Sequence, residues 1–147
     1  MLAREANDFY VVHVDRETLD FYACNASRLA EHYASVEASP LAPLIEGLEG
    51  CRRVLDVGCG TGRDLAILLE AGFDAYGADP SPEMIAQAER QIEIRGYSPN
   101  RRLIEAGLPG LEPFDSEEFD AVFCNAVLMH IPEESIFDAV YGLRRIL

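Results

Sequence analysis

Hydrophobic residues recur along this chain with two different spacings, and the two spacings predict different elements. Between residues 15 and 34 they follow one another in three- and four-residue steps, which is the period of an amphipathic helix. Asp15 or Thr18 can cap that helix, and a second short helix is expected near 42–47. Residues 9–14 fit either a short strand or an apolar lead-in.

From residue 51 onward, short apolar runs alternate with longer helical stretches. Strands are expected at 54–57, 74–78, 102–105 and 119–124, with helices at 64–71, at 82–95 and from 130 to the end. Gly72 terminates one helix, and Ser81 followed by Pro82 begins the next. This order predicts an α/β fold with a mainly parallel sheet and helices on both faces. We expect a single domain, 1–147, with a helical segment at 1–50 and a core at 51–147.

Polar or small residues stand where the predicted strands end. Asp56 lies near the end of the first strand, Asp79 follows the second, 105–108 follow the third and Asn125 follows the fourth. Parallel strands that are joined by crossovers end along one edge of the sheet, and ligands bind there. The sequence therefore predicts one site that is built from these four positions.

A glycine-rich loop connects the first strand to the next helix. Gly58, Gly60 and Gly62 leave a turn that lets a ligand approach the backbone. Arg63 stands where a dinucleotide fingerprint needs its third glycine, and the chain contains no lysine for a phosphate loop. Asp56 stands two residues before the first glycine, where burial of a carboxylate is costly unless something binds it.

The pattern D-x-G-x-G-x-G, followed by an acid after the next strand, resembles motif I of the S-adenosylmethionine-dependent methyltransferases. The resemblance runs from about Asp15 to the last residue and is greatest to the small-molecule branch. It implies a Rossmann-like three-layer fold with an N-terminal helical cover. It also implies S-adenosylmethionine as cofactor and S-adenosylhomocysteine as product.

The resemblance assigns roles to individual residues of this chain. Asp56 would hold the methionine end of the cofactor and Asp79 both ribose hydroxyls, because one carboxylate can accept two hydrogen bonds. The remaining expected cofactor contacts are Gly58, Cys59, Gly60 and Gly62 as the floor, Pro80 and Met84 beside the adenine, the backbone of Ala106, Gly107 and Leu108 at the adenine edge, Asn125 at the methyl end, and Tyr10 and Tyr22 in the cover.

Methyl transfer is a displacement at a sulfonium carbon, so positioning supplies much of the catalysis. A base is needed only where the acceptor must lose a proton. His130 is the histidine nearest the predicted site, and it is either that base or a packing residue at a helix start.

Composition narrows the range of partners. The net charge is −14, and every basic residue other than histidine is arginine. An acidic chain is repelled by nucleic acids and by anionic membranes, so we expect a small-molecule acceptor and neither of these partners. The 4 cysteines form no C-x-x-C pair and no histidine stands at ligand spacing to them, which indicates reduced thiols, a cytoplasmic protein and no metal site.

The chain ends at Leu147, before the last strands that the resemblance implies. The fourth strand would then be an uncovered sheet edge, which predicts either a homodimer that covers this side or a truncated piece of a longer protein. The expected function is methyl transfer from S-adenosylmethionine to a small molecule. The alternative is a cofactor-binding module without catalysis of its own, and Arg63 disfavours a nicotinamide-dependent oxidoreductase.

Overall fold

The computed structural model describes residues 15–35 and 39–147 of the chain. At its centre lies a parallel sheet of four described strands in the order β3-β2-β1-β4. These strands are β1 (Arg53–Val57), β2 (Asp74–Asp79), β3 (Leu103–Glu105) and β4 (Ala121–Cys124). The predicted fold class is thus confirmed, and strand order reverses between β1 and β4, where ligands bind in such sheets.

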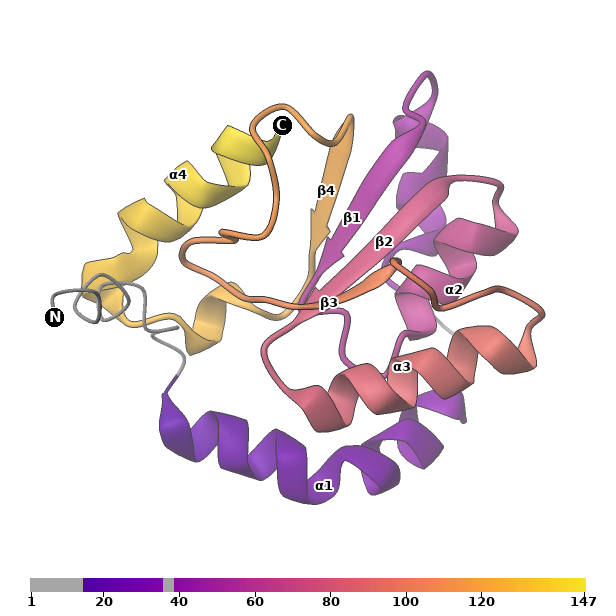
Figure 1. The fold of residues 1–147 in the computed structure, drawn as a ribbon, viewed down its shortest axis with the longest axis horizontal. Helices are drawn as coiled ribbons and strands as arrows, with labels where there is room; N and C mark the ends of the chain where they lie inside the picture. The colour runs from indigo at the N-terminus through magenta and orange to yellow at the C-terminus, as the bar shows by residue number, and fades with distance from the viewer. Residues whose placement is uncertain (1–14, 36–38) are drawn as a thin grey trace, which may run out of the picture.

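Helices cover both faces of this sheet (Figure 1). Side chains of β1 alternate between the two faces: Val54 packs in one apolar cluster with α2 (Arg63–Glu70) and α3 (Pro82–Ile94). Leu55 and Val57 point the other way, into a cluster with α4 (Ile136–Ile146) and the loop after β3. Because β1 is buried on both faces, it is apolar except for Asp56, which shares the face of Val54.

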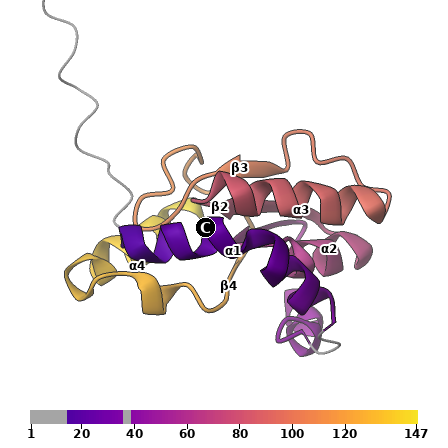
Figure 2. The ribbon, with the colours of Figure 1, turned by 90° about the horizontal axis from the view of Figure 1, so that it is seen from below.

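Helix α1 (Arg16–Ala34) packs against α3 and lies across the carboxyl ends of the strands (Figures 1 and 2). The Asp15 carboxylate caps it by accepting hydrogen bonds from the backbone N–H groups of Glu17 and Thr18. A 3₁₀ helix, η1 (Ala42–Leu48), then leads toward β1. In α3, the Ser81 hydroxyl accepts a hydrogen bond from the Met84 N–H, which is the cap predicted from the sequence.

The last helix begins later than the predicted start at residue 130. Two 3₁₀ turns, η2 (Leu128–His130) and η3 (Glu133–Ser135), precede α4. Pro132 explains the difference, since a proline excludes the residue before it from helical backbone angles, and Ile131 is extended. The prediction of a helix starting at His130 was therefore wrong, and His130 belongs to the turn that follows β4.

Helix α4 is apolar on two sides. Ala139, Gly142 and Ile146 face the interior, and Gly142 lies so close to the Pro109 carbonyl that an added Cβ would be 2.2 Å from its oxygen. Phe137, Val140 and Tyr141 lie on the other side with exposed fractions of 86%, 51% and 70%. Strand β4 pairs only with β1 among the described strands, so it is an edge of the sheet.

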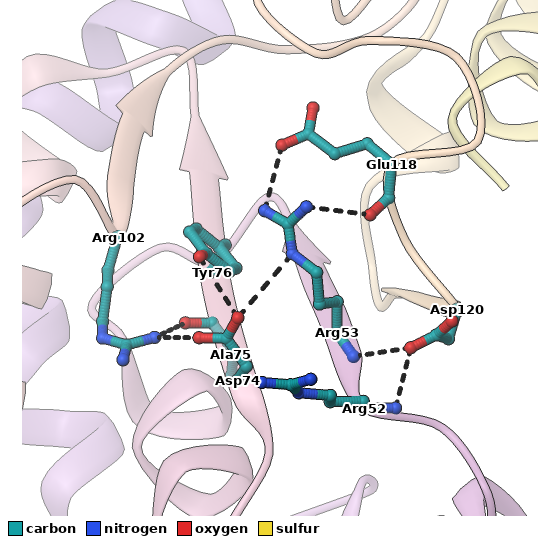
Figure 3. Close-up of polar contacts among 8 residues, drawn as sticks. All are labelled: Arg52, Arg53, Asp74, Ala75, Tyr76, Arg102, Glu118 and Asp120. Atoms are coloured by element: carbon teal, nitrogen blue, oxygen red, sulfur yellow. Dashed lines mark hydrogen bonds and ion pairs between the residues drawn. The ribbon is translucent and has the colours of Figure 1, made fainter.

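Charged residues surround the amino ends of the strands (Figure 3). The Arg53 guanidinium lies 3.2 Å from a Glu118 carboxylate oxygen and 3.7 Å from one of Asp74, and it stacks over the Tyr76 ring. The Asp120 carboxylate accepts hydrogen bonds from the backbone N–H groups of Arg52 and Arg53. This network lies at the end of the sheet opposite to the predicted site.

Within residues 15–35 and 39–147, no helix combines the length and the apolar character that a membrane crossing requires. The division at residue 50 between a helical segment and a core stays a prediction.

Candidate active site

A cavity of about 290 Å³ lies at the carboxyl ends of the strands. Its walls come from the ends of β1 and β2, the glycine loop, the start of α3, the turn after β4 and the inner side of α1. Ten of the residues that the sequence singled out line it together: Tyr22, Asp56, Gly58, Cys59, Gly60, Asp79, Pro80, Met84, Asn125 and His130.

The glycine loop is held against the end of β2. The N–H groups of Gly58 and Cys59 both donate to the Ala78 carbonyl oxygen, at 2.8 and 3.0 Å, and that of Gly60 donates to the Asp79 carboxylate at 3.0 Å. Gly58 has a φ of +70°, and a Cβ there would lie 2.3 Å from a methyl carbon of Val127. The loop therefore requires glycine at this position for both its backbone angle and the close approach of the turn after β4.

Asp56 brings a buried acceptor to the cavity wall. It is 3% exposed, and its Oδ2 atom is buried and has no hydrogen-bond partner within the described part of the chain. Burial raises the pKa of Asp56 well above the usual range for a carboxyl, and the charges of Asp64 and Asp79 raise it further. A buried acceptor without a partner is costly, so the site is built to receive a donor at this atom.

Asp79 lies at the end of β2, on the other side of the glycine loop. Its two carboxylate oxygens each accept one backbone hydrogen bond, Oδ1 from Ser81 at 2.9 Å and Oδ2 from Gly60 at 3.0 Å. Burial raises its pKa, while these two hydrogen bonds act in the opposite direction. Each oxygen keeps a lone pair for a further donor, so Asp79 can accept two more hydrogen bonds from a ligand.

Tyr22 and His130 meet across the cavity. The Tyr22 hydroxyl lies 3.2 Å from His130 Nε2, and the two rings pack edge to face with centroids 5.7 Å apart. Burial raises the pKa of Tyr22, so its hydroxyl keeps the proton at neutral pH. This contact joins α1 to the turn after β4, although 108 residues separate the two in sequence.

Cys59, on the cavity wall, and Cys124, the last residue of β4, are both poor nucleophiles. Burial raises the pKa of the Cys59 thiol well above its ordinary value, and it raises that of Cys124 to about 11. Both thiols therefore stay protonated at neutral pH.

Four predicted cofactor residues lie behind the cavity wall rather than on it. Gly62 packs against α3, where an added Cβ would lie 2.8 Å from the Ala88 Cα. Ala106 donates its N–H to the Asp79 carbonyl, Gly107 lies against the Pro80 ring, and Leu108 is buried in the core. Tyr10 lies outside the described residues. The backbone contacts to adenine near 106–108 stay a prediction.

The structure adds side chains to the site that the sequence analysis did not assign. Arg63, Asp64, Tyr33, Thr18 and Val127 all line the cavity. Thr18, Tyr22 and Tyr33 lie on one side of α1, as their spacing in a helix requires. That spacing alone could not show that this side faces a cavity rather than a core.

Comparison with known proteins identifies the family. Residues 54–147 match the model of the methyltransferase domain family, so the chain belongs to that family. The resemblance to S-adenosylmethionine-dependent methyltransferases with a Rossmann-like fold is thereby confirmed, and the predicted cofactor is the one this family uses.

Two curated relatives illustrate how different the acceptors named for related proteins are. The chain is 38% identical over 137 residues to the tRNA U34 carboxymethyltransferase of Shewanella denitrificans, a match that covers 92% of this chain and 36% of that protein. It is 37% identical over 82 residues to the ubiquinone biosynthesis O-methyltransferase of Methylococcus capsulatus, covering 56% and 34%. The chain thus spans about a third of the length of these relatives.

Among solved structures, the chain is similar to the Burkholderia thailandensis 1,6-didemethyltoxoflavin-N1-methyltransferase, which was crystallised with bound 1,6-didemethyltoxoflavin and S-adenosylhomocysteine. The TM-score is 0.67 with 21% sequence identity, and the match covers 88% of this chain and 56% of that one. This likeness supports the fold.

Proposed function

We propose that this chain binds S-adenosylmethionine in the cavity at the carboxyl ends of β1 and β2 and takes part in methyl transfer to a small molecule. The observation that carries the proposal is the pair of buried acids flanking the glycine loop. Asp56 presents a buried oxygen without a partner, and Asp79 presents two oxygens with spare lone pairs.

These residues fit the cofactor group by group. The ammonium of the methionine end would satisfy Asp56, and the two ribose hydroxyls would donate to Asp79. Pro80 and Met84, beside Asp79, form an apolar wall for the adenine. When bound, S-adenosylmethionine would supply a methyl group on a sulfonium, from which the neutral thioether S-adenosylhomocysteine is a good leaving group.

The same loop is poorly suited to a dinucleotide. The N–H groups of Gly58, Cys59 and Gly60 already donate to the end of β2. A pyrophosphate needs free N–H groups at such a loop, whereas a nucleoside with an amino-acid tail does not. This supports an adenosyl sulfonium ligand over NAD.

Titration calorimetry with S-adenosylmethionine, S-adenosylhomocysteine and NAD tests the proposal. We expect both adenosyl ligands to bind and NAD to give no heat. Binding of NAD with neither adenosyl ligand bound would refute it.

For the acceptor we propose a small molecule, because the net charge of −14 opposes a polyanion. The tRNA-modifying relative favours a second candidate, an RNA acceptor, since 92% of this chain is covered by that match. Filter binding with total tRNA at low salt separates the two. Retention of tRNA at micromolar protein would favour the RNA acceptor, and we expect none.

His130 is the candidate base, if the acceptor atom must lose a proton. Its place on the cavity wall, in contact with Tyr22, supports this role. Once an acceptor is known, His130→Ala should lower turnover and flatten its pH profile, with unchanged affinity for S-adenosylhomocysteine. An unchanged pH profile would leave His130 as a packing residue.

The alternative is a cofactor-binding module without its own catalysis. It is supported by the share of the relatives that this chain spans, about a third. Screening acceptors for conversion of S-adenosylmethionine to S-adenosylhomocysteine distinguishes the two, since a pure binding module would convert none.

We further propose that a second copy of the chain covers the β4 side. Phe137, Val140 and Tyr141 form an exposed apolar stripe on α4, and β4 is a sheet edge. Light scattering should give a dimer, and Phe137→Asp should convert it to a monomer. Ile94→Asp, at an equally exposed apolar position on α3, is the matched control and should leave the dimer intact. A wild-type monomer would refute the dimer.

We also propose a reducing, cytoplasmic location. It is supported by the free thiols of Cys24, Cys51, Cys59 and Cys124.

A further inference from the structure

The hydrogen bond between Tyr22 and His130 occupies the candidate base. The Tyr22 hydroxyl lies 3.2 Å from His130 Nε2, and both side chains line the cavity. Because burial raises the pKa of Tyr22, its hydroxyl keeps its proton and donates it to Nε2 in this hydrogen bond. A neutral imidazole has one ring nitrogen that can accept, while the other carries an N–H. A methyl acceptor that is to give a proton to Nε2 must therefore displace the Tyr22 hydroxyl.

Tyr22 can be displaced without disturbing the core. Its ring is half-buried, and Ala26 is the one buried residue of α1, all of which is described. Phe21 packs edge to face with the Tyr22 ring, with centroids 5.6 Å apart, and is itself 51% exposed. A rotation of the Tyr22 side chain thus exposes little apolar surface, so its main cost is the loss of one hydrogen bond.

The wall around this contact consists of uncharged polar and apolar side chains. The described residues that α1 and the turn after β4 contribute to the cavity include Thr18, Leu19, Asn125 and Val127. Within this described part of the wall there is no acid, arginine or lysine. A charged group bound here would lose its hydration without gaining a partner of opposite charge, which is costly. The wall therefore favours an uncharged acceptor.

The three acids of the cavity come from β1, β2 and α2, and each has another partner. Asp64 accepts hydrogen bonds from the Arg63 guanidinium, at 3.0 and 3.3 Å, and from the Ser39 hydroxyl at 2.7 Å. In the proposed function, the cofactor's ammonium and ribose hydroxyls occupy Asp56 and Asp79. A cationic amine would find no carboxylate left to pair with, which favours a hydroxyl over an ammonium group as the acceptor.

We infer that the methyl acceptor is an uncharged, phenol-type hydroxyl compound that binds by taking the place of the Tyr22 hydroxyl at His130 Nε2. This inference rests on the proposed function and names its substrate class. The Tyr22 ring packs edge to face with the imidazole, with centroids 5.7 Å apart, so the site already holds a phenol in this arrangement. As the acceptor oxygen forms its bond to the methyl carbon, its proton passes to Nε2, and the electron pair of the broken carbon–sulfur bond remains on sulfur.

The test measures the binding of four probes to the full chain saturated with S-adenosylhomocysteine, at about pH 8, where an imidazole is neutral. Each probe has one benzene ring: phenol carries a hydroxyl, anisole a methyl ether, benzoate a negative charge and benzylammonium a positive charge. Magnetic resonance signals of the histidine rings report contact with Nε2. Phenol should shift the His130 signals and leave those of His32, an exposed histidine outside the cavity, unchanged. The other three probes should bind at least about fivefold more weakly than phenol.

Tyr22→Phe should improve binding, which a merely structural role for Tyr22 would not do. The variant keeps the ring and removes the hydroxyl that competes for Nε2, so it should bind phenol roughly 2–10-fold more tightly than the wild-type protein does. Tyr97→Phe is the matched control. Tyr97 is also half-buried and lies outside the cavity, so loss of its hydroxyl should leave the affinity for phenol unchanged. Melting temperatures show whether both variants are folded.

Four results would overturn the inference while the proposed function stands. They are no binding of phenol at millimolar concentration, binding of anisole as tight as that of phenol, tighter binding of either charged probe than of phenol, and a loss of phenol affinity in folded Tyr22→Phe. The last would show that Tyr22 supports the acceptor site instead of occupying it. If Tyr22→Phe does not fold, the four probes on the wild-type protein decide. If the wild-type protein did not bind S-adenosylhomocysteine, the proposed function would fail together with the inference.

Discussion

The two ends of the central sheet carry the same kinds of charged residues and use them differently. At the amino ends of the strands, the carboxylates of Asp74, Glu118 and Asp120 are paired with arginine side chains or backbone N–H groups (Figure 3). At the carboxyl ends, Asp56 is buried with a carboxylate oxygen that has no partner in the described structure. These three carboxylates at the amino end thus have partners, whereas an oxygen of Asp56 at the carboxyl end has none among the described residues.

Burial sharpens this difference. Arg53 and Asp74 are about one-third exposed, so water screens their interactions and each pair contributes little. Asp56 and Asp79 are 3% and 8% exposed, so an unmet interaction there costs far more. Each ion pair at the amino end thus adds a little to the free energy of unfolding. The buried carboxylate at the carboxyl end lowers it in the absence of a ligand, and a ligand that donates to this carboxylate would restore it.

The largest effect that would test this contrast is expected at Asp79. Asp79→Ala should weaken S-adenosylhomocysteine binding about 100-fold or more, because each hydrogen bond to a charged group contributes roughly 1.5–3 kcal/mol. Asp74→Ala, at the other end of the same strand, is the control and should leave the affinity within about threefold. Calorimetry measures both, and equal losses in the two variants would contradict a functional difference between the two ends.

Substitution of Asp56 should raise the stability of the ligand-free protein and weaken ligand binding. Asp56→Asn removes a buried ionisable group and should raise the free energy of unfolding of the ligand-free protein by about 1–3 kcal/mol at neutral pH. The same change should weaken S-adenosylhomocysteine, because the ligand's ammonium loses its anionic partner. Chemical denaturation and calorimetry together test this, and a destabilised variant would show that Asp56 serves the fold instead.

The difference in the free energy of unfolding between Asp56→Asn and the wild-type protein, called the stability gap below, should depend on pH. Because the folded-state pKa of Asp56 is raised, the native protein binds more protons than the unfolded one above about pH 4. Wild-type stability should therefore fall as pH rises from about 4 to that folded-state pKa, and Asp56→Asn should lack this fall. Thermal melts at about pH 5, 7 and 9 would show the gap widening, and a constant gap would mean that Asp56 is not the titrating group.

The smallest effect is expected at the amino end. Arg53→Met should lower the free energy of unfolding by about 1 kcal/mol, since the exposed ion pairs and the stacking on Tyr76 are each weak. Its affinity for S-adenosylhomocysteine should not change. Arg90→Met is the control, because Arg90 is exposed and makes no ion pair with the described residues. A loss of ligand affinity in Arg53→Met would show that the two ends are coupled.

The sequence was sufficient to predict the fold and the centre of the site. Apolar runs of four to six residues that alternate with helical stretches are typical of strands in a parallel sheet, so the four strands were predictable. Asp56, Gly58, Gly60 and Asp79 were predictable too, since strand ends and the loop between them are local in sequence. The start of the last helix was not, because two short 3₁₀ turns, separated by Ile131 and Pro132, interrupt the pattern after β4.

Only the tertiary structure decided which residues meet from distant parts of the chain. The Tyr22–His130 contact and the fixing of Arg63 by Asp64, Ser39 and Tyr33 depend on how α1 crosses the ends of the strands. Spacing along α1 shows which side chains share a side, but it does not show whether that side meets a core or a cavity. The sequence alone thus determined that acids and glycines gather at the carboxyl ends of the strands, because strand and loop positions are local. The packing of α1 over it, which is non-local, determined which side chains close the cavity and contact Arg63 and His130.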